Sequence, residues 1–187
     1  LTNDDVDYHN MHPGFRMSLG SAIRLAFALP VIDVLEELLR KIRPYEKVAG
    51  STNRAFEKGM DAIVEGLELH GISGLKKGFK KAIDLMNQVK YDRTNRRPRV
   101  LIVGEYLLNF HPGANHDIED YLEHNGFEII EAHMTDVIQK SYFYLDAQIK
   151  EYKLKKPLDK KIWFSTVDKV FDMAHNMTDA IAKKHPL

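Results

Sequence analysis

A carboxylate, a histidine and an amide lie close together between Arg99 and Asn115, and they are the side chains best suited to bind or act on a ligand. Glu105 can accept a hydrogen bond from a ligand hydroxyl or transfer a proton. His111 and Asn115 can contact the same ligand, because all three follow Gly104 within one loop. Each also has a structural explanation: an ion pair with nearby arginines for the carboxylate, a surface loop for the histidine, and a helix N-cap for the amide. We expect a ligand site between Gly104 and Asn115.

Two histidines and an aspartate in the same region, His111, His116 and Asp117, raise the question of a metal. Their spacing matches no defined metal-binding motif, and a surface loop explains them. The chain has no cysteine, so it supplies no thiolate nucleophile, no cysteine-ligated zinc and no cysteine-held iron–sulfur cluster. We expect no metal and no cofactor within this chain.

Arg43 is a further candidate for ligand binding, because it precedes Pro44 at the predicted end of a helix. A guanidinium held at a turn suits a phosphate. The structural alternative is an ion pair with Glu46 or a contact with the loop that follows the strand.

The local pattern around the candidate loop is strand, long loop, helix. Residues 100–103 form a short unbroken aliphatic run, typical of a strand buried on both faces, and Asn115 can cap the helix that follows. Residues 127–133 form a second strand candidate after the helix-ending Asn125 and Gly126. These elements predict a right-handed βαβ unit. Ligands bind beyond the carboxyl ends of parallel strands, which is where this loop would lie.

Amphipathic patterns before and after this unit predict helices. Residues 15–43 read as two helices separated at Pro30, and two more helices are expected at about 52–69 and 75–89, with an interruption at 70–74. Helices are also expected from Thr135 or Asp136 and in a last long segment after Pro157. The predicted fold is α/β: a helical N-terminal portion at residues 1–95, then a partial Rossmann-like domain, doubly wound, parallel and helix-dominated, at residues 96–187. Two strands alone do not form a stable sheet, so strands from further chain or from a partner subunit are expected beside them.

Composition excludes several functional classes. The 187 residues include 27 basic and 27 acidic side chains, so no net charge attracts nucleic acid or an anionic membrane. No apolar run reaches the roughly 20 residues of a membrane span, and the first residues lack the features of a signal peptide. We therefore expect a cytoplasmic protein that binds neither nucleic acid nor membrane.

Three stretches of the chain resemble one protein family in order and approximate spacing. The first is Asp-Val-Leu-Glu-Glu-Leu-Leu-Arg-Lys-Ile-Arg-Pro-Tyr-Glu-Lys at 33–47, with Gly50 shortly after. The second is Arg-Pro-Arg-Val-Leu-Ile-Val-Gly-Glu at 97–105, and the third is His-Pro-Gly-Ala-Asn-His-Asp-Ile at 111–118. Together they resemble the 2-hydroxyacyl-CoA dehydratases and the related CoA-substrate-specific enzyme activase proteins.

The resemblance implies a place in anaerobic acyl-CoA metabolism, where an ATP-driven activase passes an electron to an iron–sulfur dehydratase, a lyase. This chain has neither a nucleotide-binding fingerprint nor cysteines. It would thus be a segment of the dehydratase-like portion that contributes substrate-side or scaffold surface and is inactive alone. An iron–sulfur cluster and ATP would belong to the full-length protein or its partners. The expected partners are an acyl-CoA substrate or other dehydratase and activase components, or a second copy in a homo-oligomer.

Two other functions remain open at this point. One is a non-catalytic α/β domain that binds a ligand or a partner through the loop from Gly104 to Asn115. The other is a free-standing nucleotide-binding domain. Fold-level likeness does not choose among these functions.

Overall fold

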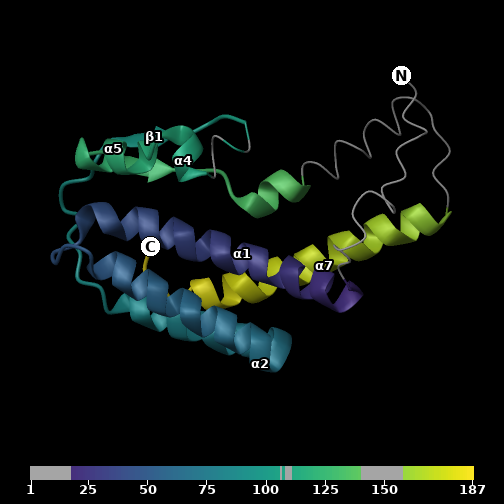
Figure 1. The fold of residues 1–187 in the computed structure, drawn as a ribbon. Coiled ribbons are helices and arrows are strands. Elements are labelled where there is room, and N and C mark those ends of the chain that lie inside the picture. Colours follow the sequence, from purple (N-terminus) through teal and green to yellow (C-terminus); the bar gives the residue numbers. More distant parts are fainter. Residues whose placement is uncertain (1–17, 106, 108–110, 140–157) are drawn as a thin grey trace, which may run out of the picture.

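The computed structural model describes residues 18–105, 107, 111–139 and 158–187. In this part of the chain, long helices dominate and a two-stranded parallel sheet lies on one side of them (Figure 1). The predicted α/β class is confirmed in this coarse form. The elements in chain order are α1 (Leu19–Ile42), the 3-10 turn η2 (Arg43–Tyr45), α2 (Ser51–Asn87), β1 (Arg99–Leu101), α4 (Pro112–Asn115), α5 (Ile118–His124), β2 (Glu128–Ile130) and α7 (Leu158–Ala182).

Helix α1 runs without a break past Pro30, so the prediction of two helices at this position is wrong. A proline inside a helix removes one backbone hydrogen bond. Pro30 and the adjacent Val31 are fully buried in the core, and this burial offsets the lost bond. The Ser18 hydroxyl caps the helix by accepting a hydrogen bond from the backbone N–H of Ser21 at 3.1 Å.

The predicted interruption at residues 70–74 is confirmed. Gly71 leaves the helical conformation at φ 59° and ψ −141°, a region open to glycine, and the two arms of α2 fold back on each other. Gly66 lies opposite Gly74, and Ala62 lies opposite Gly78, so the arms are antiparallel. α2 is therefore a helical hairpin whose arms approach closely because glycines line the contact.

The hydrophobic core lies where α1, the α2 hairpin and α7 meet. Its fully buried side chains include Leu35 of α1, Phe79 of α2 and Ala174 of α7. In Figure 1, α7 lies alongside α1 on the side away from the sheet. The last helix thus completes the core of the N-terminal helices. The second arm of the hairpin turns four lysines to solvent, as expected for an amphipathic helix: Lys76, Lys77, Lys80 and Lys81.

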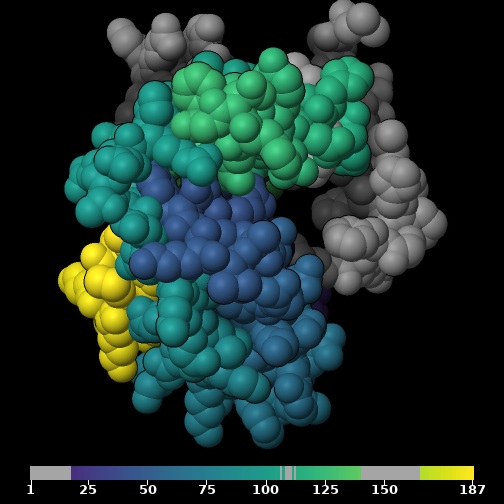
Figure 2. All heavy atoms as spheres, turned by 90° about the vertical axis from the view of Figure 1, so that its left-hand side faces the viewer, coloured from purple at the N-terminus to yellow at the C-terminus, as the bar shows by residue number. Residues whose placement is uncertain are grey.

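β1 and β2 are parallel, with Val100 opposite Ile129, and α4 and α5 connect them. This βαβ unit lies over α1 (Figure 2). β1 is not buried on both faces as predicted: Leu101 is 56% exposed, and Val103 beyond it is 75% exposed. The reason is that α1 covers only one side of a sheet of two strands.

The helix after the loop begins later than predicted. α5 starts at Ile118, and its N-cap is Asp117, which adopts the left-handed conformation at φ 53°. Asn115 instead ends the short helix α4. The predicted helix end at Asn125 and Gly126 is confirmed, since Gly126 has φ 89°.

Candidate functional site

A cavity of about 370 Å³ lies between α1 and the βαβ unit. From the βαβ side it is lined by Asn115, which follows the loop after β1, by Glu131, the first residue after β2, and by Met134. The cavity is therefore beyond the carboxyl ends of both strands, where α/β proteins bind ligands. The remaining lining residues come mainly from α1 and include one from each of α2 and α5: Leu29, Ile32, Asp33, Glu36, Leu39, Arg40, Phe56 and Glu119.

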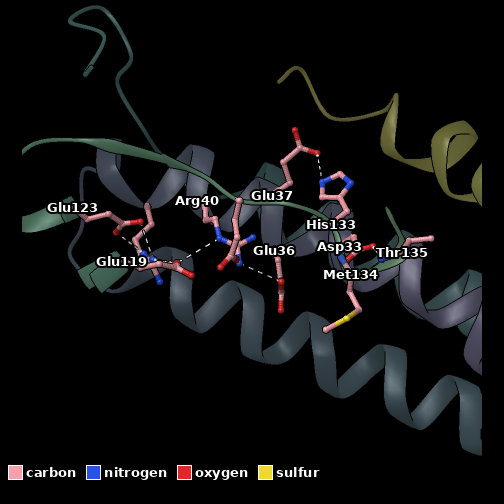
Figure 3. Close-up of polar contacts among 11 residues, drawn as sticks. Asp33, Glu36, Glu37, Arg40, Glu119, Glu123, His133, Met134 and Thr135 are labelled. Carbon is pink, nitrogen blue, oxygen red and sulfur yellow. Dashed lines mark hydrogen bonds and ion pairs between the residues drawn. The ribbon is translucent and has the colours of Figure 1, made fainter. Parts of the chain in front are cut away.

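Arg40 is surrounded by three carboxylates in this cavity. Its Nη2 lies 3.3 Å from Oε2 of Glu36 on the same helix, and its Nε lies 3.4 Å from Oε2 of Glu119 on α5. The same guanidinium forms a close ion pair with Glu131. Figure 3 shows the Arg40 side chain between Glu36 and Glu119. Arg40 of α1 thus forms ion pairs with two parts of the βαβ unit: helix α5, through Glu119, and the segment after β2, through Glu131.

Glu131 is the least exposed of these carboxylates, and its side chain is only 1% exposed. Burial raises the pKa of its carboxyl to about 7; the positive charge of Arg40 opposes this rise, and the negative charges of Glu119 and Glu36 add to it. Burial also raises the pKa of Glu36. Glu131 Oε1 is buried without a hydrogen-bond partner among the described residues. The site therefore holds a carboxyl that changes charge near neutral pH.

We predict that Glu131→Gln stabilises the protein at about pH 8 by about 1–2 kcal/mol and has little effect at about pH 5. The pKa of Glu131 in the folded state is raised from its usual 4.5 to about 7, so the folded state binds the proton more tightly and loses stability as the pH rises from about 4.5 through 7. Glutamine cannot ionise, and Arg40 keeps Glu36 and Glu119 as partners. Urea unfolding followed by far-UV circular dichroism at both pH values measures the effect. A variant that is less stable at both pH values would contradict it.

Asp33 lines the same cavity but is engaged in a helix cap. It is only 4% exposed. Its Oδ1 accepts a hydrogen bond from the backbone N–H of Met134, and its Oδ2 accepts one from that of Thr135, both at 2.9 Å. The Thr135 hydroxyl donates to it as well (Figure 3). A side chain of α1 therefore caps the helix that begins at residue 134.

A second polar contact joins the same two segments. His133 Nε2 lies 3.5 Å from Oε2 of Glu37. The hydrogen bond from His133 lowers the pKa of Glu37 to about 2, and the same bond raises the pKa of His133. The segment after β2 is thus held to α1 by Asp33, Glu37 and Arg40.

The Arg-Pro-Tyr-Glu stretch forms the joint between the helices and the βαβ unit. Arg43 donates from Nε and Nη2 to the carboxylate of Glu123 at 2.7 and 2.8 Å. The Tyr45 hydroxyl donates to Glu128 Oε2 at 2.7 Å. Arg43 pairs with α5 rather than with Glu46 or the loop, and it does not line the cavity. Burial lowers the pKa of Arg43, but its hydrogen bond and charge contact with Glu123 outweigh this, so its pKa is raised.

The carboxylate of Glu46 caps the start of α2. Its carboxylate accepts hydrogen bonds from the backbone N–H of Thr52 at 2.8 Å and from the hydroxyls of Ser51 and Thr52. These bonds satisfy the first free N–H groups of α2. Burial raises the pKa of Glu46, but these hydrogen bonds outweigh it, so the net pKa is lowered.

The structure brings one of the five predicted ligand-binding residues into the cavity. Asn115 lines it, and its Oδ1 is buried without a partner among the described residues. Gly104 and Glu105 are exposed. His111 is exposed, and its Nδ1 accepts a hydrogen bond from the Ala114 N–H at 3.2 Å.

Sequence analysis missed the charged residues of α1. Asp33, Glu36 and Arg40 follow one another at intervals of three and four, which places them on one face of a helix. The spacing shows that the three charged side chains share a face of α1, and the packing of the βαβ unit on α1 decides that this face meets Glu119 and Glu131.

In the described ranges, no three histidine, aspartate or glutamate side chains come together in a way that would hold a metal ion. Within the same ranges, no helix combines the length and apolar character of a membrane span. Comparison with protein-family models, curated proteins and solved structures finds no match to this chain. The resemblance to the dehydratase and activase-related proteins therefore rests on its three sequence stretches.

Proposed function

We propose that this chain is a ligand-binding portion of a protein related to the 2-hydroxyacyl-CoA dehydratases and activases, and that it contributes substrate-side surface through the cavity above α1. The cavity's position beyond the carboxyl ends of β1 and β2, with Asn115 on its wall, is the observation that carries this proposal. Asn115 belongs to the third of the three family-like stretches. The first stretch supports the same site, because Arg43 and Tyr45 hold α5 and β2 in place.

The cavity presents hydrogen-bond acceptors that lack donors. Asn115 Oδ1 and Glu131 Oε1 are both buried without a partner among the described residues. Buried acceptors of this kind are normally satisfied by a protein group, a water or a ligand. The hydroxyl of a 2-hydroxyacyl group is a donor of suitable size, and the acyl chain can contact Leu29, Ile32 and Phe56 on the apolar wall. The phosphates of coenzyme A would stay outside, since carboxylates outnumber arginines in the cavity.

We predict that a 2-hydroxyacyl-CoA binds at least about tenfold more tightly than the acyl-CoA of the same length without the hydroxyl. Asn115→Ala should remove most of this difference, because the hydroxyl loses its acceptor. Isothermal titration calorimetry with both thioesters and free coenzyme A measures it. Asn95→Ala, which changes an exposed asparagine outside the cavity, is the matched control and should bind like the parent protein. Equal affinities for the two thioesters, or binding that is insensitive to Asn115, would contradict the proposal.

A second candidate function is the binding of a small ligand that carries no coenzyme A, by a domain without catalytic chemistry. The observation that favours it is the charge of the cavity, where the described part of the chain supplies one guanidinium, that of Arg40, and four carboxylates: Asp33, Glu36, Glu119 and Glu131. Such a lining repels the phosphates of a nucleotide. The same titrations distinguish the two functions: a free hydroxy compound that binds as tightly as its thioester would favour the second.

A further inference from the structure

The cavity carries more negative charge than its own arginine neutralises. Among the described residues, four carboxylates line it, from Asp33, Glu36, Glu119 and Glu131, against the one guanidinium of Arg40. Arg43 lies outside the lining and is already bonded to both carboxylate oxygens of Glu123. Charges held in a partly buried space interact more strongly than in water. A ligand with a positive charge would therefore be stabilised here, and an anion would be repelled.

Two buried oxygen atoms indicate where in the cavity a positively charged group of the ligand would bind. Glu131 is 8% exposed as a residue, and its Oε1 has no hydrogen-bond partner among the described residues although Arg40 binds the same carboxylate. Asn115 Oδ1 has none either. An amide carbonyl and an ionised carboxylate only accept hydrogen bonds, so both atoms require a donor. A protonated amine supplies three donors together with a positive charge.

The rest of the lining is apolar and limits the size of the ligand. Phe56 contributes an aromatic ring, which attracts cations. The aliphatic part of the wall consists of Leu29, Ile32, Leu39 and Met134. A volume of about 370 Å³ is near the lower end of the range for ligand pockets, so the ligand is small. The described histidines and carboxylates form no group able to hold a metal ion, which favours an organic cation.

We propose that the cavity binds a small primary amine in its protonated form, with the ammonium group at Glu131 and Asn115 and a hydrocarbon stem along the apolar wall. This proposal rests on the second candidate function above, the binding of a small ligand without coenzyme A, and adds the charge that the ligand carries. Among ligands with one carbon skeleton, the ammonium compound should bind more tightly than the alcohol, and the carboxylate should bind least.

The charge of Glu131 makes this binding depend on pH. With its pKa at about 7, the Glu131 carboxyl is mostly protonated at about pH 6 and mostly ionised at about pH 8. The charged groups around it are Glu36 and Arg40 from α1, Glu119 from α5 and, in the adjoining hollow, these further side chains: Glu37, Lys41, Arg99, Glu128 and His133. His133 loses its positive charge as the pH rises, which also favours an incoming cation. Amine affinity should therefore increase about tenfold between these pH values.

The experiment titrates the intact protein with butylamine, butanol and butyrate at about pH 6 and pH 8, by isothermal titration calorimetry. We expect butylamine to bind most tightly, with about tenfold higher affinity at the higher pH, and butyrate not to bind. Glu131→Gln should weaken butylamine binding about tenfold at the higher pH and remove most of its pH dependence. Glu57→Gln, an exposed position on α2, is the matched control and should leave both unchanged. Circular dichroism spectra confirm that each variant is folded.

The outcomes separate this proposal from the function on which it rests. If butanol binds in a manner that requires Asn115 and butylamine binds no better, the cavity binds ligands but the cationic preference is wrong. If none of the three compounds and no acyl thioester binds, both proposals are wrong. Butylamine binding with the same pH dependence in Glu131→Gln would also overturn the assignment of the ammonium site.

Discussion

Gly74→Ala is expected to destabilise the protein by about 3 kcal/mol, because an added methyl group would overlap the opposite arm of the α2 hairpin. A Cβ atom at position 74 would lie 1.9 Å from the carbonyl oxygen of Gly66 and 2.6 Å from its carbonyl carbon. Both are backbone atoms of the opposite arm of α2, so no side chain can move aside. The arms must separate, and the adjacent core residues Leu75 and Ile63 lose contacts. Thermal and urea unfolding of the full chain measure the loss.

Gly20→Ala is the matched control for this substitution. Gly20 lies near the start of α1, and among the described residues the atom closest to an added Cβ is the hydroxyl oxygen of Ser18 at 3.8 Å. Alanine is the better helix former, so this variant should be unchanged or more stable by up to about 1 kcal/mol. Equal stability of the two variants would contradict the close backbone contact between Gly66 and Gly74.

Asp33→Ala is the second substitution with a large expected effect, a loss of about 3 kcal/mol. It removes the acceptor of three hydrogen bonds and leaves the N–H groups of Met134 and Thr135 without a partner. Thr135 is 1% exposed, so water cannot easily replace the carboxylate. The helix that begins at residue 134 would lose its N-cap, and with it one of the three links between α1 and the segment after β2.

Two further variants test this account of Asp33. Asp33→Asn keeps an oxygen acceptor and should lose less stability than the alanine variant. Asp61→Ala changes an exposed aspartate of α2 and should stay within about 0.5 kcal/mol of the parent protein. Hydrogen exchange at the amides of Met134 and Thr135 adds a local readout, because the protection of both should fall in Asp33→Ala and stay unchanged in Asp61→Ala. Unchanged protection of these amides would show that another group caps this helix.

The two substitutions differ in their expected effect on the cavity. Asp33 and Met134 line it, so loss of the cap would loosen the wall formed by the segment after β2. Gly74 does not line the cavity, and Phe56, the residue of α2 among the described lining residues, lies on the opposite arm of the hairpin. Ligand binding should therefore be impaired in Asp33→Ala under conditions where the protein is still folded.

The sequence by itself determined the elements that depend on local patterns. The break near Gly71, the helix end at Gly126 and the last helix after Pro157 follow from residue types within a few positions, and the structure has all three. The two strands and their parallel pairing were also predictable, because one helical connection between two strands favours that arrangement. The solvated lysine face of α2 followed from its spacing alone.

Only the tertiary structure decided the features that depend on contacts between distant segments. Pro30 predicts a helix break because it lacks a backbone N–H, yet α1 continues past it because Pro30 is buried in the core. The length of residues 100–103 and their apolar character suggested a doubly buried strand, but burial also requires neighbours, and α1 covers one face only.

In the candidate site, too, some features follow from the local sequence and others depend on packing. Asn115 was predictable from the position of its loop, whereas the ion pairs around Arg40 join α1 to residues 79 and 91 positions away. A charged residue on a helix face has the same local pattern whether it meets water or an opposing charge. Which one it meets is fixed by how the βαβ unit packs on α1. The position of Asn115 could therefore be predicted from the sequence, while the charge of the cavity that it lines depends on the packing.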